Sequence, residues 1–251
     1  MDKNLLIIIP AYNEEANIGI FLQKLKDSSV MDMADVMVIN DASTDNTPSI
    51  VNALQIPVMN HPYNLGYGAA LQTGYKYAMA KNYQFLIQID SDGQHDICNI
   101  ESIYKQLTKK ENTPDLVIGT RFHKESQSFP ISWAKKIAIR FFRRFIKVTS
   151  KMSVTDPTSG LQGMNREVFG YYSHFDNFDP NYPDANMIVQ MALLGFNIQE
   201  IPAVMHARKG GKSMHIGIIE PVLYMFIMVF STLNVYIRNR KKGGHRRVPT
   251  I

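Results

Sequence analysis

The chain has 251 residues and a net charge of +5, a size that suits one α/β domain and leaves little room for a second. Apolar residues make up 45% of the sequence, which excludes intrinsic disorder over most of the chain. A single cysteine, Cys98, excludes an internal disulfide and a cysteine-based zinc site, and suits a reducing cytoplasm. The N-terminal apolar run, Leu5–Ile9, is too short for the core of a signal peptide.

Short apolar runs alternate with helical patterns through the first half of the chain. The expected strands are Leu5–Ile9, Val36–Ile39, Ile56–Met59, Phe85–Ile89 and Leu116–Ile118. The expected helices are Glu15–Lys26, Pro48–Leu54, Ala69–Ala80 and Ile97–Lys109. This alternation predicts an α/β fold, with a mostly parallel sheet covered by helices on both faces. Ligands of such sheets bind at the carboxyl ends of the strands.

Residues 131–149 have the spacing of an amphipathic helix, between loops expected at 122–130 and 173–184. One face is apolar and another is basic. The apolar face has Trp133, Ile137, Phe141, Phe145 and Val148, and the basic face has Lys136, Arg140, Arg143 and Lys147. This pattern is typical of a helix lying on an anionic membrane surface, the alternative being a helix packed on the sheet. Nucleic acid is not an expected partner, because the aromatic residues do not alternate with the basic ones.

Pro221–Ile237 is apolar except for three polar residues, and six basic residues follow within 238–247. A helix of this length spans about 25 Å, at the short limit for crossing a bilayer. Three alternatives stay open: an in-plane or re-entrant helix, a membrane crossing, or a buried or oligomer-contact helix. We expect two parts, a catalytic domain at 1–215 and a membrane-associated helix with a basic tail at 216–251.

The strongest chemical signal is Asp90-Ser91-Asp92-Gly93-Gln94-His95, directly after an expected buried strand. Two carboxylates two residues apart, with the Gln94 amide nearby, can share a hard divalent cation such as Mg²⁺ or Mn²⁺. The alternative is a polar strand-to-helix turn. For His95 we expect a hydrogen bond within the turn rather than a metal contact.

Asn40-Asp41-Ala42-Ser43-Thr44-Asp45 follows the second expected strand. Asp41 stands where it can accept a hydrogen bond from a nucleobase, whereas the last three residues are expected to cap and form a turn. The glycines at 64–70 lack dinucleotide-binding spacing, and there is no Walker A sequence. A nicotinamide dehydrogenase is therefore not expected.

Seven segments in this order resemble the family 2 inverting glycosyltransferases, and most of all the dolichyl- or polyprenyl-phosphate sugar transferases. They are Ile9–Glu15, Asn40–Thr47, Asn64–Ala70, Asp90–His95, Gly119–Arg121, Asp156–Gly160 and Arg208–Ser213. The resemblance covers roughly residues 5–215 and implies a GT-A fold, a nucleotide-sugar donor and a divalent metal, Mg²⁺ or Mn²⁺. Asn40 and Ala42 depart from the family pattern beside Asp41, and Gln162 departs from it where an arginine is common.

The resemblance also implies a donor site. Pro10, Tyr12 and Glu14 would line the nucleoside pocket, with Asp41 on the base. Asp90 would face the ribose of the donor or the metal.

The remaining assignments concern the diphosphate and the acceptor. Asp92 and Gln94 would hold the metal against the diphosphate. Arg208 and Lys212 would lie on a mobile loop that closes over phosphate. Arg121 would face the phosphate of the acceptor.

The leading hypothesis is transfer of a sugar to a polyprenyl phosphate by a protein that is peripheral or monotopic at the cytoplasmic face of the membrane. The metal and Arg208 would stabilise the leaving group. In a second hypothesis the acceptor is a hydroxyl of a lipid-linked sugar or polysaccharide, with Asp184 as general base. Asp184 is equally placed to cap a helix at Ala185–Leu194. A third hypothesis is an inactive relative that recruits a partner at the membrane. A second copy of the chain or a small membrane protein is a further expected partner.

Overall fold

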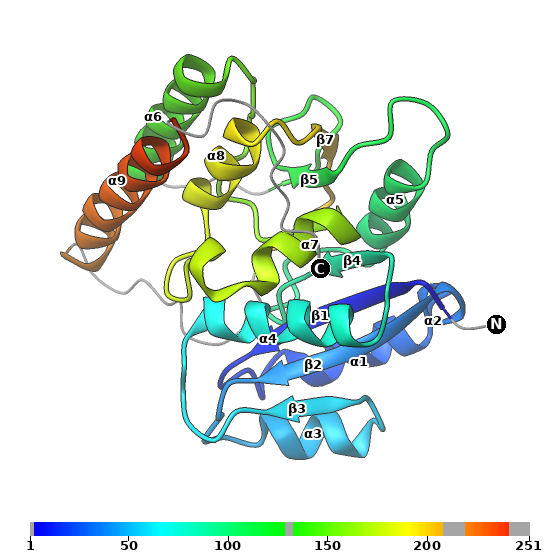
Figure 1. Ribbon diagram of the computed structural model, residues 1–251. Coiled ribbons are helices and arrows are strands. Elements are labelled where there is room, and N and C mark those ends of the chain that lie inside the picture. Colours follow the sequence, from blue (N-terminus) through cyan, green and yellow to red (C-terminus); the bar gives the residue numbers. More distant parts are fainter. Residues whose placement is uncertain (1–2, 129–132, 208–218, 241–251) are drawn as a thin grey trace.

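The computed structural model describes residues 3–128, 133–207 and 219–240, which contain a seven-stranded sheet (Figure 1). The strands are β1 Leu5–Ala11, β2 Ala34–Asn40, β3 Val58–Asn60, β4 Phe85–Gln88, β5 Leu116–Thr120, β6 Gln162–Asn165 and β7 Ile198–Pro202. Their order is β3-β2-β1-β4-β6-β5-β7. Among these strands, β6 alone runs antiparallel to its neighbours. The predicted α/β fold with a mostly parallel sheet is confirmed.

The helices of the described residues follow the predicted ones closely and add three that the sequence did not indicate. They are α1 Ile18–Lys26, α2 Val30–Met33, α3 Thr47–Ala53, α4 Tyr67–Ala80, α5 Cys98–Leu107, α6 Trp133–Ser150, α7 Arg166–Ser173, α8 Ala185–Leu193 and α9 Ile219–Arg240, with a 3₁₀ turn at Phe175–Asn177. The added elements are α2, α7 and the 3₁₀ turn. They are short, and their apolar residues are too few to give a clear period.

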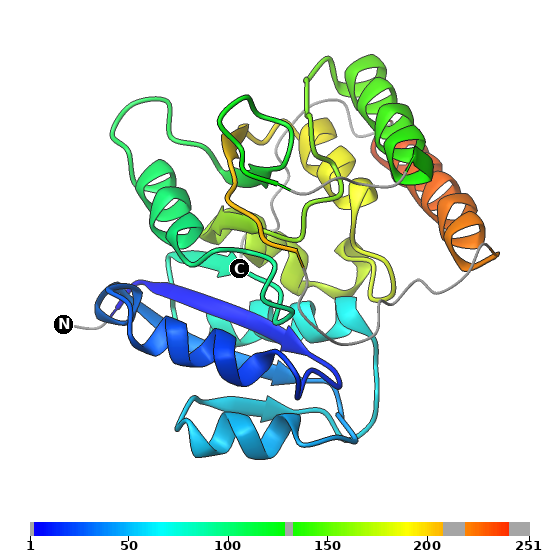
Figure 2. The same cartoon turned by 180° about the vertical axis from the view of Figure 1, so that it is seen from behind.

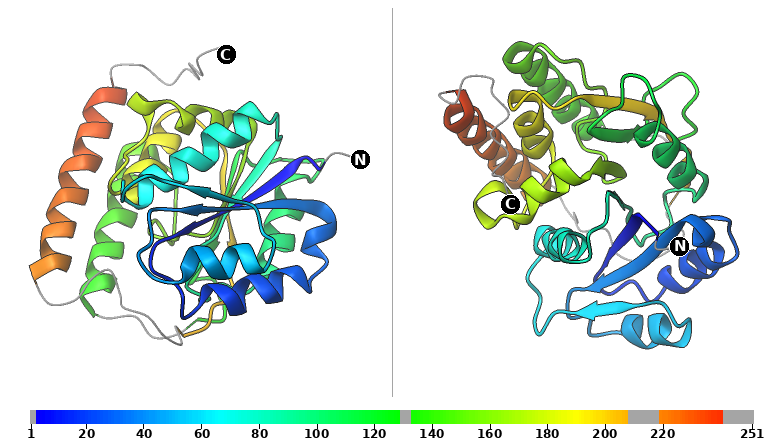
Figure 3. Two further views of the ribbon diagram at one scale, coloured as in Figure 1. Left: turned by 90° about the horizontal axis from the view of Figure 1, so that it is seen from below. Right: turned by 45° about the vertical axis from the view of Figure 1, so that its right-hand side comes forward.

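The core is divided by the sheet into two layers. Leu5, Ile7 and Ile9 of β1 pack with α1, α3 and α5. Leu6 and Ile8 pack on the other face with α4, α7 and α8. Because successive side chains of a strand point to opposite faces, β1 must be apolar throughout to be covered on both sides. Helices lie on both faces of the sheet in Figure 3.

The helices α6 and α9 lie side by side at one side of the molecule (Figures 1 and 2). Phe142 of α6, Ala185 of α8 and Met228 of α9 form a small buried cluster. The rings of Phe145 and Tyr236 meet edge to face with centroids 6.1 Å apart. These contacts fasten α9 to α6 and α8.

The sequence-based prediction for α6 needs one correction. Its inward face consists of Ile139, Phe142 and Ile146, which are buried. Three residues of the predicted apolar face, Ile137, Phe141 and Val148, are exposed, next to exposed Arg140, Arg144 and Lys147, so these three do not pack on the sheet. Arg143 was expected on the basic face, but its Nε donates to the backbone oxygen of Thr155 and its guanidinium lies over the Phe122 ring. The side chain of Trp133 lies outside the described residues.

The outward side of α9 is apolar as well. Phe226, Phe230, Leu233 and Ile237 recur at helical spacing and are exposed. We call these four residues the α9 stripe. Across residues 3–128, 133–207 and 219–240, no helix has the combination of length and apolar character needed to cross a membrane.

Candidate active site at the carboxyl edge of the sheet

The sheet topology brings distant parts of the sequence to one edge. Because β1, β2, β4 and β5 point the same way, the residues that follow them meet at their carboxyl ends. The segment 156–160 joins them because β6 runs the opposite way, so that its amino end lies at this edge. The segment Asn64–Ala70, which follows the parallel strand β3, reaches the same edge. Six of the seven predicted motifs therefore lie together, and the seventh, Arg208–Ser213, lies outside the described residues.

Asp90 lies at the centre of this edge. Its Oδ1 accepts a hydrogen bond of 2.9 Å from the Tyr67 hydroxyl, and 31% of its side chain is exposed. Gly160 lies against Oδ2, where an added Cβ would come within 2.5 Å. Ser91 fixes the turn to β1, since its Oγ donates to the Pro10 oxygen at 2.9 Å.

The rest of the turn carries a second carboxylate, two residues after Asp90. Asp92 Oδ1 accepts a hydrogen bond of 3.0 Å from the Gln94 backbone nitrogen, across Gly93 at φ +72°. Within the described residues, no three His, Cys, Asp or Glu side chains are close enough together to hold a metal ion. The donor set of Asp90, Asp92 and the Gln94 amide nevertheless fits Mg²⁺ or Mn²⁺, which accept hard oxygen ligands and complete their shells with water and substrate phosphates.

His95 is buried beneath this turn. Its side chain lies with Nε2 3.9 Å from Asp90 Oδ2, and its Nδ1 has no hydrogen-bond partner among the described residues. Burial lowers the pKa of His95 to about 4, so the ring is neutral at neutral pH. The expected turn hydrogen bond is not made by Nδ1.

Asp41 is buried at the end of β2 and organises the glycine turn. Its Oδ1 accepts from the Leu65 nitrogen at 2.8 Å and lies 2.7 Å from His61 Nδ1. Its Oδ2 accepts from the Gly66 nitrogen at 2.8 Å. This carboxylate therefore holds the turn from which α4 begins and from which Tyr67 reaches Asp90. The nucleobase contact of Asp41 stays a prediction.

The loops after β1 and β2 are joined by hydrogen bonds. The Asn13 nitrogen donates to Ser43 Oγ at 3.0 Å, and the Glu14 nitrogen donates to Thr47 Oγ1 at 2.9 Å. Asp45 Oδ1 accepts from the Thr47 nitrogen at 2.9 Å, which forms the turn expected at this residue.

The predicted nucleoside pocket residues lie along these loops. Pro10 is buried in β1, whereas Tyr12 is 47% exposed. Ala42 has φ +58°, a left-handed conformation that explains why glycine is common at this position in the family.

Arg121 lies at the end of β5 in a buried ion pair. Its Nε donates to Asp156 Oδ2 at 2.7 Å and its Nη2 to Asp156 Oδ1 at 2.6 Å. Nη2 also donates to Thr158 Oγ1 at 2.8 Å. Burial opposes its charge, but the hydrogen bonds and negative charge of Asp156 raise the pKa of Arg121 above its ordinary value. Its predicted contact with the acceptor phosphate stays a prediction.

Asp184 stands at the N-terminus of α8, where its side chain makes no capping hydrogen bond. Asn186 Oδ1 takes that role, accepting from the nitrogens of Asp184 at 2.8 Å and Met187 at 2.9 Å. The capping alternative for the Asp184 carboxylate is therefore wrong. Burial and then Asp90 raise the pKa of Tyr67 well above its usual value, and the charge of Asp184 raises it further. The charge of Asp184 also contributes to the raised pKa of Arg121, so Asp184 acts electrostatically on both Tyr67 and Arg121.

Arg208 and Lys212 lie outside the described residues. The chain that leads to them is fixed to the Asp92 turn, because the His206 nitrogen donates to the Gln94 oxygen at 2.7 Å. The Asp96 nitrogen donates to the Val204 oxygen at 3.1 Å, so two backbone hydrogen bonds join segment 204–206 to this turn. The last described residues before Arg208 consequently lie beside the proposed metal ligands.

Sequence reasoning missed two groups that complete the site. Tyr67 was not identified from the sequence as a site residue. Its place between Gly66 and Gly68 at the start of an expected helix could have indicated such a role. Gly160 was not singled out either, and the structure shows that only a residue without Cβ leaves room for the Asp90 carboxylate there.

Comparison with known proteins identifies the family. The sequence model described as "Glycosyl transferase family 2" matches residues 6–172, more than half of the chain. A polyprenol monophosphomannose synthase of Mycolicibacterium smegmatis is 24% identical over 84% of this chain and 81% of its own length. An undecaprenyl-phosphate mannosyltransferase of Micrococcus luteus is 25% identical over 84% of this chain and 87% of its own.

The solved structures agree on the fold. Glucosyl-3-phosphoglycerate synthase of Mycobacterium tuberculosis, in complex with Mn²⁺, UDP-glucose and phosphoglyceric acid, has a TM-score of 0.68 at 17% identity, over 93% of this chain and 80% of that one. The GT-A fold is thereby shown, and the match over residues 6–172 includes the Asp90–Asp92 turn and the Arg121–Asp156 pair. The chain belongs to glycosyl transferase family 2 and is a glycosyltransferase.

Proposed function

We propose that this glycosyltransferase moves a sugar from a nucleotide-sugar donor to a polyprenyl phosphate at the cytoplasmic face of a membrane, with inversion at the anomeric carbon. The observation that carries the proposal is the single edge where Asp90, Asp92 and Arg121 meet, next to helices with exposed apolar and basic residues. Relatives named as polyprenol and undecaprenyl-phosphate mannosyltransferases support the acceptor class.

The donor would bind over the loops after β1 and β2, with its diphosphate at the Asp90 turn. Pro10, Tyr12, Glu14 and Asp41 are the proposed nucleoside contacts. Asp90, Asp92 and Gln94 would hold Mg²⁺ or Mn²⁺, which offsets negative charge on the diphosphate as it leaves. A fold neighbour solved with Mn²⁺ and UDP-glucose supports this combination of ligands.

The acceptor would approach from the Arg121 side. An oxygen of the lipid phosphate attacks the anomeric carbon, and the bond from that carbon to the diphosphate oxygen breaks on the opposite side. The phosphate is already an anion and needs no general base. Arg143 supports an anionic acceptor here, because its buried Nη2 has no hydrogen-bond partner among the described residues and it shares the Phe122 ring with Arg121. Arg208 and Lys212 are the proposed cations that cover the leaving group.

A hydroxyl acceptor is the second candidate, favoured by one observation. The Asp184 carboxylate does not cap α8, and its charge acts on Arg121, the side from which the acceptor would approach. An inactive relative is the weakest of the three hypotheses, because Asp90, Asp92 and Gln94 are all present at the edge of the sheet.

The membrane-associated part of the proposal rests on α6 and α9. Exposed Phe141 and Val148 stand beside exposed Arg140, Arg144 and Lys147, and the α9 stripe lies on the neighbouring helix. An apolar surface bordered by basic residues suits the boundary between acyl chains and anionic head groups. In this proposal residues 1–215 carry the site and 216–251 add a helix and tail that associate with the membrane.

The direct test offers purified protein a panel of radiolabelled nucleotide sugars with Mn²⁺ and three acceptors: a polyprenyl phosphate, the matching polyprenol and 3-phosphoglycerate. We expect label in the polyprenyl phosphate alone. Transfer to 3-phosphoglycerate alone would replace the lipid acceptor with a small phosphorylated one.

Replacing Gly160 tests the Asp90 site. Gly160→Ala places a Cβ 2.5 Å from Asp90 Oδ2, closer than a van der Waals contact allows, so the carboxylate must move. We expect roughly a tenfold or larger loss of Mn²⁺-dependent nucleotide binding, measured by calorimetry, because metal ligands tolerate little displacement. The control is Gly19→Ala in α1, where the added Cβ meets only the end of the Ile50 side chain at 3.1 Å. Equal binding by both variants would contradict the placement of the metal at Asp90.

Replacing Asp184 separates the two acceptor classes. With a lipid phosphate as nucleophile, Asp184→Asn should change kcat by less than about tenfold, since no proton has to be removed. With a hydroxyl as nucleophile, the same change should lower kcat by about 10²- to 10⁴-fold. Initial rates with saturating donor and each acceptor give the answer, and circular dichroism confirms that the variant is folded.

Neutralising the exposed basic residues of α6 tests the membrane surface. The triple change of Arg140, Arg144 and Lys147 to Gln should weaken binding to vesicles with anionic lipid by up to about a hundredfold at low salt, because each charge contributes about 1 kcal/mol near such a surface. The matched control changes exposed Lys24, Lys105 and Lys110, which lie on or next to α1 and α5. Co-sedimentation of the full chain is the measurement, and equal loss in both triples would overturn the assignment of α6.

A further inference from the structure

A buried polar cluster connects α9 to the site. Asn186 of α8 is fully buried, and its amide makes four hydrogen bonds. Its Nδ2 donates to Asp179 Oδ2 at 2.9 Å and to Ser231 Oγ at 2.8 Å. Its Oδ1 accepts from the nitrogen of Asp184 and from that of Met187. One amide thus holds the backbone that carries Asp184 and a side chain of α9.

Asp179 closes the cluster. Its Oδ2 also accepts a hydrogen bond of 3.1 Å from Ser231 Oγ. Its Oδ1 accepts from the nitrogens of Asn181 and Tyr182, both at 3.0 Å. The Asp179 carboxylate therefore stabilises the loop 179–184 by hydrogen bonds to the loop's own backbone and to α9. We call Asp179, Asn186 and Ser231 the α9 triad.

The same loop supports the other side of the site. The Pro180 oxygen accepts from the Ala69 nitrogen at 3.0 Å. A Cβ on Gly68 would lie 2.5 Å from that oxygen and 2.6 Å from the Asp179 oxygen, so the loop and the start of α4 touch through their backbones. Tyr67, one residue earlier, donates to Asp90. A displacement of the loop therefore moves Tyr67 and Asp184 together.

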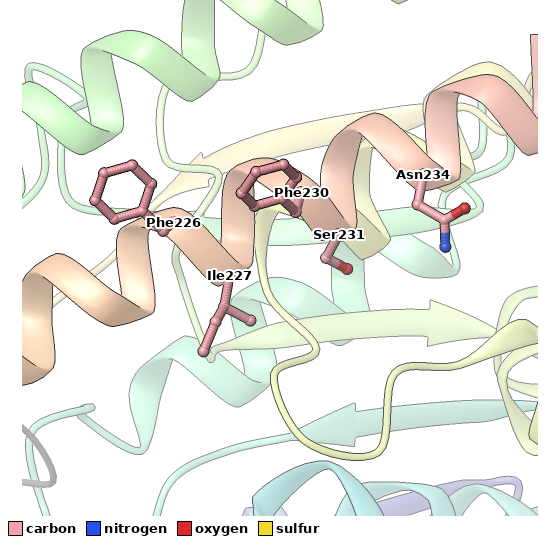
Figure 4. Close-up of a pocket in the computed structure, with 5 residues that line it drawn as sticks. All are labelled: Phe226, Ile227, Phe230, Ser231 and Asn234. Carbon is pink, nitrogen blue, oxygen red and sulfur yellow. The ribbon is translucent and has the colours of Figure 1, made fainter.

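We propose that the α9 triad is a set of positioning residues through which α9 holds in place the backbone of Asp184 and the Tyr67 side chain that donates to Asp90. Ser231 is the member supplied by α9. It projects from the same side of the helix as Ile227, away from Phe226 and Phe230 of the α9 stripe (Figure 4). The helix α9 consequently has the apolar α9 stripe on one side, and on another side it has the Ser231 hydroxyl that bonds to Asp179 and Asn186. This inference rests on the proposed function only for its kinetic consequence.

The chain supplies a matched pair of variants. Ser231→Ala removes a hydroxyl with two partners. Thr232→Val removes the hydroxyl of the next residue, which is buried and has no hydrogen-bond partner among the described residues. Ser231→Cys keeps the volume with a much weaker donor, and Ser231→Thr keeps the hydroxyl.

Hydrogen–deuterium exchange of the full chain tests the connection without reference to catalysis. Ser231→Ala and Ser231→Cys should speed exchange about tenfold in peptides covering 179–187 and also 65–70, as expected for losing a hydrogen bond to a charged group. Thr232→Val and Ser231→Thr should leave both peptides as in the unchanged protein. Faster exchange confined to α9 in the two Ser231 variants would overturn the proposal.

Kinetics then separate a positioning role from a general loss of stability. In Ser231→Ala, kcat for sugar transfer should fall about tenfold, by a larger factor than the Kd for the nucleoside diphosphate with Mn²⁺ rises, and Ser231→Thr should restore kcat. An unchanged kcat in Ser231→Ala would overturn the kinetic consequence. If the unchanged protein transfers no sugar to polyprenyl phosphate, the proposed function is wrong. The exchange experiment still shows whether the α9 triad holds segments 179–187 and 65–70.

Discussion

The buried pair of Arg121 and Asp156 is the interaction on which the β5–β6 side of this site depends. Asp156 is fully buried, and both of its oxygens are engaged by the Arg121 side chain. The nitrogens of Thr155 and Asp156 donate in turn to Glu200 of β7. The ion pair joins the end of β5 to segment 155–156, which precedes β6. The backbone of that segment is bonded to the edge strand β7. Removing either partner would leave a buried charge, at a cost of about 3–5 kcal/mol.

That pair exists because β6 runs against the rest of the sheet. A parallel strand in its place would bring its carboxyl end to the site and carry segment 156–160 to the far edge. The antiparallel direction instead puts Asp156 beside Arg121 and Gly160 against Asp90. The sheet therefore has a parallel half that presents the proposed donor residues and a mixed half that closes the site around them.

Features of this arrangement that depend on neighbouring residues were predictable from the sequence, whereas those that depend on contacts between distant residues were not. The strands of the parallel half are continuous apolar runs, and the Asp90 turn is a local motif, so both were predictable. The strands β6 and β7 are short, and polar residues such as Gln162 and Glu200 interrupt them. Helical periodicity placed Arg143 on a basic face, but Thr155 and Phe122 turn it inward. The sequence also suggested that Asp184 caps α8, but Asn186 makes the capping hydrogen bonds instead. The orientation of Asn186 is set by hydrogen bonds to Asp179 and Ser231, and Ser231 is distant in the sequence.

The charge balance at the edge explains why a basic segment should follow β7. Asp90, Asp92 and Asp184 are acidic, and the charge of Arg121 is balanced by Asp156. In the proposed reaction two phosphate-bearing substrates meet at this edge, and like charges so close repel strongly unless cations intervene. In that proposal a divalent cation at Asp90 and Asp92 would supply part of the positive charge. Arg143 and the basic residues of 208–212 would supply the rest, and the latter follow the segment that is hydrogen-bonded to the Asp92 turn. An edge this acidic would thus need positive charge from the metal, from α6 and from the chain beyond β7 to receive two phosphates.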